Sequence, residues 1–288
     1  MPGSFVSSAF ALAFASSLLY GSADFLGGIA SRRARALAVT LLTQALGLLA
    51  LVAAAWGVGG TVPRDAWGWA TGAGLCGSIG VLLFYRALAV GTVSIVAPVT
   101  SAIALVVPVA AGLLAGERPG VLPLAGIALA PLAVVLVGGG GVAPGTEDAR
   151  RAQRALVLAH VSGVLIGGFL VCVGRLPPGG GLWPLAIARA VGTVTIAAAL
   201  VARRESPAAP RAAWAPILGC ALLDVAANVC FRFAVARGAL SLVATIVSLA
   251  PATTVLLARF VLHERLDARQ KSGVAVALAA IVLLSRAG

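Results

Sequence analysis

Charged residues are scarce in this 288-residue chain. They make up 10% of it, with nine acidic residues against 21 basic ones, whereas soluble domains carry about 25% charged residues. The scarcity excludes an ordinary soluble domain. Only two histidines are present, and no HExxH or phosphate-loop signature occurs. Because catalysis and metal binding usually need clustered His, Asp and Glu, we expect no enzymatic activity, no metal site and no cofactor. The four cysteines form no CxxC pair, and we expect no structural disulfide.

Long apolar runs dominate what is present. Hydrophobic residues make up 60% of the chain and the mean hydropathy is +1.06. A helix that crosses a bilayer needs roughly 20 mostly apolar residues. Ten such stretches can be marked, over residues 5–28, 37–58, 66–89, 93–115, 121–140, 155–174, 182–202, 213–235, 239–262 and 271–286. They predict an all-α integral membrane protein with ten transmembrane helices, surrounded by the lipid bilayer.

The second half of the chain repeats the first. Residues 84–137 align without a gap with residues 231–284, so that Gly91 falls on Gly238 and Ser101 on Ser248. Each repeat holds five spans, and an odd number of spans turns the second copy upside down in the membrane. Inverted repeats of this kind are typical of secondary transporters, whose substrate site lies near mid-membrane at the repeat interface.

A glycine-rich segment separates the two copies. Gly138–Gly141 is followed by a stretch that ends in Glu147 and Asp148, and such charges keep a flexible linker out of lipid. We therefore predict a first five-helix repeat over 1–141, a linker over 142–154 and a second five-helix repeat over 155–288.

The basic residues gather at the ends of the spans, so we expect no nucleic-acid partner despite the net charge of +12. One side of the predicted bundle holds Arg32, Arg33, Arg35, Arg150, Arg151, Arg154, Arg203, Arg204, Arg211, Arg265, Arg269 and Lys271. The other side holds Arg64, Arg118, Arg175, Arg237 and Arg286. Because short cytoplasmic loops are rich in Lys and Arg, this bias predicts that both termini lie outside the inner (plasma) membrane.

The fourth and ninth predicted spans correspond between the repeats, and both combine proline with small hydroxyl residues. Pro98 and Pro108 interrupt the fourth span and Pro251 the ninth, and a proline inside a helix removes a backbone hydrogen bond. The hydroxyl residues are Ser94, Thr100, Ser101, Ser241, Thr245, Ser248 and Thr253. We predict that the two helices line a central cavity. The alternative is that the hydroxyls bond back to carbonyls of their own helices.

Ionisable residues inside a span are costly and are functional candidates by default. Arg189 lies near the middle of the seventh span and Asp224 near the middle of the eighth, with Asn228 one helical turn further on the same stripe. Gln44 occupies the position in the first repeat that matches Arg189. One hypothesis is that Arg189 or Asp224 binds a charged end of the substrate or a proton. The other is a structural ion pair between them.

Asp24 is the only acid in the first span and follows Tyr20 by one helical turn. It is either a coupling or gating acid or a partner for Arg86 or Arg32. Together these considerations predict a set of cavity residues, with ion coupling through Asp24 and Asp224. The set is Tyr20, Asp24, Gln44, Ser78, Tyr85, Ser94, Pro98, Ser101, Arg189, Asp224, Asn228, Ser241, Thr245 and Ser248.

Several motifs recur in order across the chain. They are Tyr20–Phe25 (YGSADF) in the first span, Ala87–Ala89 (ALA) followed by Val96–Pro98 (VAP), the Gly116–Arg118 (GER) and His263–Arg265 (HER) turns, and Gly126 and Gly273. With these motifs the sequence resembles the EamA-type branch of the drug/metabolite transporter superfamily.

The resemblance implies ten spans from two repeats, alternating access, and export of amino acids, other metabolites or drugs. Related four-helix exporters couple protons through a glutamate in the first span, and this chain has Asp24 as the only acid there. We expect a monomeric exporter of small amphipathic metabolites such as amino acids. The alternatives are a proton-coupled exporter of lipophilic cations, an antiporter of phosphorylated sugars, a purely structural membrane protein and, least favoured, a membrane enzyme.

Overall fold

The computed structural model describes residues 3–114, 121–138, 147–177, 179–235, 237, 243, 246–247, 250–263 and 268–284. Within these ranges the regular structure is helical, without a strand. The helices are α1 (Gly3–Arg33), α2 (Ala36–Val58), α3 (Ala66–Val90), α4 (Val93–Leu114), α5 (Val121–Gly138), α6 (Glu147–Gly174), α7 (Trp183–Ala202), α8 (Arg211–Val235), α10 (Ala250–Val261) and α11 (Ala268–Leu284).

Six of the described helices are long and apolar enough to cross a membrane: α1, α2, α3, α6, α7 and α8. Their surfaces agree with this composition, because large apolar side chains point outward from the bundle. Leu49, Val194 and Val201 are about 70% exposed, which would be a liability in water but suits a lipid-facing surface. The predicted all-α, multi-pass membrane protein is therefore confirmed, while the count of ten spans stays a prediction.

One predicted span begins later than the helix of the structure. We predicted a sixth span from residue 155, but α6 begins at Glu147. Its first turn holds Glu147 and Asp148, which complement the positive end of the helix dipole, and Glu147 lies 3.6 Å from Arg151 one turn on. In the predicted ninth span, 239–262, the described residues Val243, Ile246 and Val247 are helical and α10 covers Ala250–Val261.

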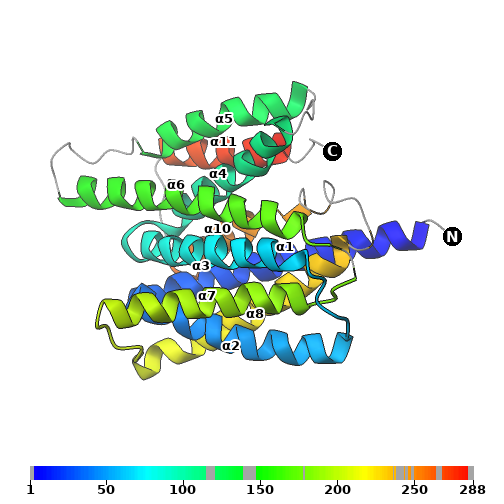
Figure 1. Cartoon of the computed structure of the whole chain (residues 1–288). Helices are drawn as coiled ribbons and strands as arrows, with labels where there is room; N and C mark the ends of the chain where they lie inside the picture. The colour runs from blue at the N-terminus through cyan, green and yellow to red at the C-terminus, as the bar shows by residue number, and fades with distance from the viewer. Residues whose placement is uncertain are drawn as a thin grey trace.

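Figure 1 shows the helices side by side with their axes roughly aligned. α5 and α11 form one edge of the bundle, α2 lies at the opposite edge, and the remaining helices fill the space between them. α1 begins and α11 ends towards the same end of the bundle, and α1 and α6 run in opposite directions.

The packing of the helices has an approximate twofold pattern. α1 packs against α8 and α10, and α6 packs in the same way against α3 and α4, while α5 pairs with α11 and α2 with α7. Exchanging each helix of the first repeat for its counterpart in the second reproduces these pairs. The repeat that we found in the sequence is therefore also a repeat of helix packing.

Buried serines at matching positions tie the repeats together. The Ser16 hydroxyl in α1 donates to the Ala227 carbonyl in α8 at 2.9 Å, and the Ser162 hydroxyl in α6 donates to the Gly80 carbonyl in α3 at 2.8 Å. Both serines are fully buried. Hydrogen bonds between membrane helices contribute about 0.6 kcal/mol each on average, so they add to close packing and do not replace it.

Glycines make that close packing possible at two matching seams. A Cβ on Gly167 of α6 would lie 2.5 Å from the Val107 Cβ and 2.6 Å from the Ala104 oxygen of α4. Gly21 of α1 meets Ala250 and Thr253 of α10 in the same way. Gly21 corresponds to Gly167, Ala250 to Ala104 and Thr253 to Val107, and the two members of each pair are 146 positions apart. The alignment of residues 84–137 had an offset of 147, so the contact register differs by one residue.

The adjacent glycines Gly167 and Gly168 allow a matched test of this seam. We expect Gly167→Ala to destabilise the protein by about 1–3 kcal/mol, because the added methyl meets a backbone carbonyl that cannot move aside. Gly168→Ala meets the Cys76 sulfur at an ordinary 3.4 Å and should be neutral or slightly stabilising. Thermal unfolding of the purified variants in detergent measures the difference. Equal melting temperatures for the two variants would contradict the tight seam.

Candidate functional site

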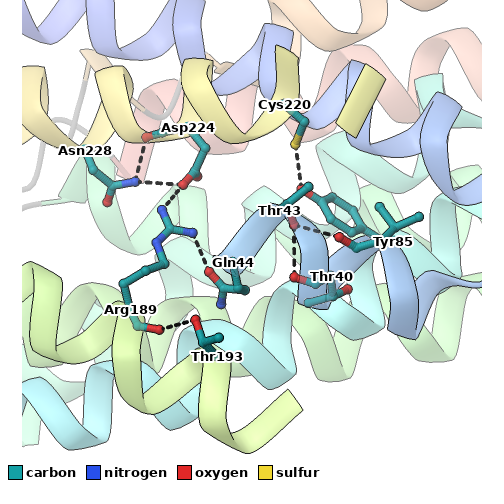
Figure 2. A network of polar contacts seen from close by, with 10 residues as sticks. Thr40, Thr43, Gln44, Tyr85, Arg189, Thr193, Cys220, Asp224 and Asn228 are labelled. Carbon is teal, nitrogen blue, oxygen red and sulfur yellow. Dashed lines mark hydrogen bonds and ion pairs between the residues drawn. The ribbon is translucent and has the colours of Figure 1, made fainter. Parts of the chain in front are cut away.

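A charged network lies where α2, α7 and α8 meet. The Arg189 guanidinium of α7 donates through one terminal nitrogen, Nη2, to Asp224 Oδ2 of α8 and through the other, Nη1, to Gln44 Oε1 of α2. Figure 2 shows the guanidinium between these two acceptors. Asn228, one turn after Asp224, donates to the Asp224 carbonyl at 2.7 Å and to its carboxylate at 3.2 Å. The structure thus brings together four residues that we predicted to face a cavity.

The network is largely shielded by protein. Gln44 is 6% and Asn228 7% exposed, and the side chains of Arg189 and Asp224 keep 15% and 26% of their surface. An isolated charge at this depth would be expensive, and pairing the two charges offsets much of that cost. The structural ion pair that we weighed for Arg189 and Asp224 is present, and both side chains keep part of their surface exposed.

Two glycines let side chains of α2 and α7 cross each other's helix. A Cβ on Gly47 of α2 would lie 3.4 Å from the Arg189 Cζ, and a Cβ on Gly192 of α7 would lie 3.0 Å from the Gln44 Nε2. Gln44 precedes Gly47 by three residues, and Arg189 precedes Gly192 by three. The two pairs, Gln44 with Gly47 and Arg189 with Gly192, therefore occupy matching positions in the two repeats, but only the second pair carries a charge.

Asp24 and Tyr20 approach the network from α1. Both lie within electrostatic range of Asp224, and Asp24 is only partly buried. In the described part of the chain no hydrogen bond or ion pair joins Asp24 to another side chain. Arg32, one of the partners that we considered for it, donates to the carbonyls of Leu88 and Gly91 at 3.2 and 3.1 Å.

Tyr85 is held by its neighbours and is 5% exposed. Its hydroxyl lies 2.9 Å from the Cys220 sulfur of α8, and its ring covers Gly27 of α1, where a Cβ would leave no room. Tyr85 therefore packs α3 against α1 and α8 near the charged network, at the cytoplasmic side of our predicted topology.

The hydroxyl residues with described hydrogen bonds fall into two groups. Most bond back to carbonyls one turn earlier, as Thr40, Thr43, Thr193 and Thr195 do, and Ser78 donates to the Leu75 carbonyl at 3.3 Å. We gave this alternative for the hydroxyls of the fourth and ninth predicted spans, and none of these five residues belongs to those spans, so it stays a prediction there. Those that tie helices together, Ser16 and Ser162, were missed by the sequence analysis.

Thr254 of α10 belongs with these ties, because its hydroxyl donates to the Gly21 carbonyl of α1 at 2.9 Å. The sequence analysis missed it as well. A signal was available, since Ser16 and Gly21 have the same residue types at Ser162 and Gly167, 146 positions later.

The cavity residues predicted on α4 lie apart from the charged network. Ser94 and Pro98 are buried and Ser101 is partly buried, and α4 packs against α6, α10 and α11, not closely against α7 or α8. The buried Thr100 hydroxyl has no hydrogen-bond partner among the described residues. Ser241, Thr245 and Ser248, like the turns at Glu117 and Glu264, lie outside the described residues.

In the described ranges no group of three or more His, Cys, Asp or Glu residues is placed to hold a metal ion. The groups that the network offers are a guanidinium, a carboxylate and two amides.

Comparisons with known proteins agree with the repeat. A model of the EamA-like transporter family matches residues 7–139 and again residues 153–286. A solved crystal structure, described simply as a protein, is similar over 96% of this chain and 96% of its own, at 20% identity and a TM-score of 0.66. At that identity the likeness concerns the fold alone. No curated protein matched the sequence.

The Arg189–Asp224 pair can be tested by a double-mutant cycle. We expect Arg189→Gln and Asp224→Asn each to lower the free energy of unfolding by about 3 kcal/mol, because each leaves one charge buried without its partner. The double variant removes both charges and should be less destabilised than the sum of the singles. Asp24→Asn is the matched control and should cost little. Thermal unfolding in detergent measures all four, and strictly additive losses would contradict the pairing.

Proposed function

This chain belongs to the EamA-like transporter family, and we propose that it is a secondary exporter of small amphipathic metabolites such as amino acids. The family places it among membrane transporters of the drug/metabolite transporter superfamily and outside the classes of enzymes. The observation that carries the proposal is the charged network at the meeting of the two repeats. A cation, an acid and a second acid that has no partner among the described residues can together receive a substrate that carries both charges.

The proposed mechanism is alternating access at this site. The opposite directions of α1 and α6 (Figure 1) and the exchanged pairing of helices support two inverted five-helix repeats, with ten spans in all. In such transporters one bundle rocks against the other around a fixed central site. Because α1 is tied to α8 and α10, and α6 to α3 and α4, each rocking bundle would draw helices from both repeats. A monomer contains both bundles and is sufficient for transport.

A second candidate is a proton-coupled exporter of lipophilic cations. It requires an acid in the site that is not already neutralised, and Asp24 has no partner among the residues that the structure describes. An antiporter of phosphorylated sugars fits less well, because it would need several free cations and the central Arg189 is already paired with Asp224.

The orientation in the membrane is a separate proposal. We propose that the protein resides in the inner (plasma) membrane with both termini outside. The exposed Arg203 and Arg204, after α7, would then face the cytoplasm. Trp56 and Trp183, whose rings meet edge to face at 5.7 Å, would lie at the outer interface, where amphipathic rings are enriched.

Cysteine accessibility tests the orientation. Thr61 and Ser206 are exposed and lie in loops at opposite ends of the predicted spans, and no native cysteine in the described residues is exposed. We expect a membrane-impermeant maleimide to label Thr61→Cys in intact cells, and to label Ser206→Cys only after the cells are made permeable. The parent protein gives the background, and the reverse pattern of labelling would contradict the proposed orientation.

Transport itself is tested with purified protein in liposomes. We expect uptake of labelled amino acids that unlabelled amino acids compete away, with a loss of about tenfold or more in Asp224→Asn, because the variant lacks the negative charge that would pair with the ammonium group of the substrate. An imposed pH gradient, applied to the parent and to Asp24→Asn, then distinguishes proton coupling from facilitated exchange. A gradient dependence that disappears in Asp24→Asn would assign the coupling to that acid.

Uptake of lipophilic cations but of no amino acid would reject the leading proposal in favour of the second candidate. Amino-acid uptake that Asp224→Asn leaves intact would reduce Asp224 to a structural partner of Arg189. Size-exclusion profiles of the variants control for loss of the fold.

A further inference from the structure

We propose that Tyr85 and its neighbours form the cytoplasmic gate of the transport pathway, and that this structure holds the gate closed beside the charged network. The inference rests on the proposed transport by alternating access and adds to it the contact that must open for a substrate to pass. The contact joins residues 27–32 of α1 to residues 85–91 at the end of α3, and we call it the α1–α3 gate.

Tyr85 lies one helical turn to the cytoplasmic side of the charged network. Its hydroxyl is 2.9 Å from the Cys220 sulfur, and Cys220 precedes Asp224 by four residues on the same face of α8, as Figure 2 shows. In the proposed orientation α8 runs outward from the cytoplasm, so Cys220 and Tyr85 both lie inward of Asp224. A substrate bound at the network would have to pass Tyr85 to reach the cytoplasm or to arrive from it.

Three successive contacts close the gate. A Cβ on Gly27 would lie 2.4 Å from the Tyr85 ring, and a Cβ on Gly28 would lie 3.2 Å from the end of the Leu88 side chain. One turn further along α1, the Arg32 guanidinium donates to two carbonyls at the end of α3, at 3.2 and 3.1 Å. Tyr85 is 5% exposed and Leu88 is fully buried. The contact therefore extends from beside the network to the cytoplasmic end of α1.

The gate joins the two bundles that we expect to rock. α1 packs against α8 and α10, whereas α3 packs against α6, so each of the three contacts crosses from one bundle to the other. Tyr85 starts on α3 and touches both Gly27 of α1 and Cys220 of α8. Rocking that separates the cytoplasmic ends of the bundles would therefore withdraw Tyr85 and break the hydrogen bonds of Arg32.

The corresponding contact at the opposite end of the bundle differs. α6 and α8 are the counterparts of α1 and α3, but over the helix residues that the structure describes they do not pack closely against each other. Gly174, the counterpart of Gly28, is exposed, whereas Gly28 is buried. Arg232, the counterpart of Tyr85, donates to the Gly181 carbonyl before α7 at 3.3 Å. Because the two faces of such a transporter open in turn, this difference indicates a state that is closed towards the cytoplasm.

A disulfide across the gate tests whether it must open. A Cβ at position 28 would lie 3.5 Å from the Leu88 Cβ, which matches the roughly 3.5–4.5 Å between the Cβ atoms of bridged cysteines. We expect oxidation of the double variant Gly28→Cys/Leu88→Cys to lower amino-acid uptake into liposomes by about tenfold or more, because the link prevents rocking. Reduction should restore uptake, and the reduced double variant controls for the fold.

A matched control places the same kind of link inside one bundle. A Cβ on Gly168 of α6 would lie 3.8 Å from the Cβ of the native Cys76 of α3, so Gly168→Cys can be oxidised to a disulfide with it. We expect this link to leave uptake unchanged, since α3 and α6 move together. The loss of free thiols, measured by mass shift with a maleimide polymer, verifies both links.

A second measurement does not depend on the substrate. Cys220 is fully buried, and we use protein that keeps it as the single cysteine. We expect a membrane-impermeant maleimide, applied to inside-out vesicles, to label Cys220 in Tyr85→Ala, because the ring that closes the path to it is gone. Tyr85→Phe keeps the ring over Gly27 and loses only the hydroxyl, so its Cys220 should stay as protected as in the parent.

The outcomes separate the gate from the proposed function. Uptake that is blocked by the linked gate and unaffected by the control link supports the inference, as does labelling of Cys220 confined to Tyr85→Ala. Unchanged uptake through the linked gate, equal losses in both linked variants, or a protected Cys220 in Tyr85→Ala overturns the inference and leaves the proposed function standing. If the parent takes up no amino acid, the proposed substrate is rejected and the labelling decides on the gate. If Tyr85→Ala fails to fold, the linked variants decide.

Discussion

Close contact between helix backbones is the constraint on which this structure depends. In lipid, apolar helices gain no hydrophobic drive from one another, so they associate through packing and through hydrogen bonds between helices. Here that contact occurs where a glycine in one helix meets a carbonyl and a Cβ in another, as at Gly21 and Gly167. Buried serines reinforce the same seams. Since both seams recur in the two repeats, one solution to the packing problem serves the whole bundle.

The charges depart from this symmetry. Arg189 stands where the first repeat has Gln44, and the resulting pair lies across the contact between α2 and α7. A symmetric pair of arginines would repel at this distance, and a symmetric pair of glutamines would leave Asp224 without a cation. The asymmetric pair allows a cation to be buried with one acid and one neutral acceptor. The two repeats share the frame of helices and differ in the charge at this position.

Membership of the EamA-like family establishes a transporter, and the network indicates what such a transporter can recognise. Under the proposed function, a paired cation and a nearby acid without a described partner would receive the charged groups of a substrate. The helices that carry Asp24, Arg189 and Asp224 belong to different repeats.

The sequence by itself determined the class of protein, the repeat and the residues with unusual chemistry, because hydropathy, spacing and charges inside spans are local properties. It also identified Arg189, Asp224, Asn228 and Gln44 as candidates. Only the tertiary structure decided that Arg189 lies between Gln44 and Asp224 and that Asp24 has no described partner. It also showed that Ser16 and Ser162 tie helices together, whereas Thr43 bonds within its own helix. The reason is physical: a span of about 20 apolar residues is helical whichever neighbours it meets, but the partner of a buried polar group depends on which helices pack together and how far each is turned about its axis.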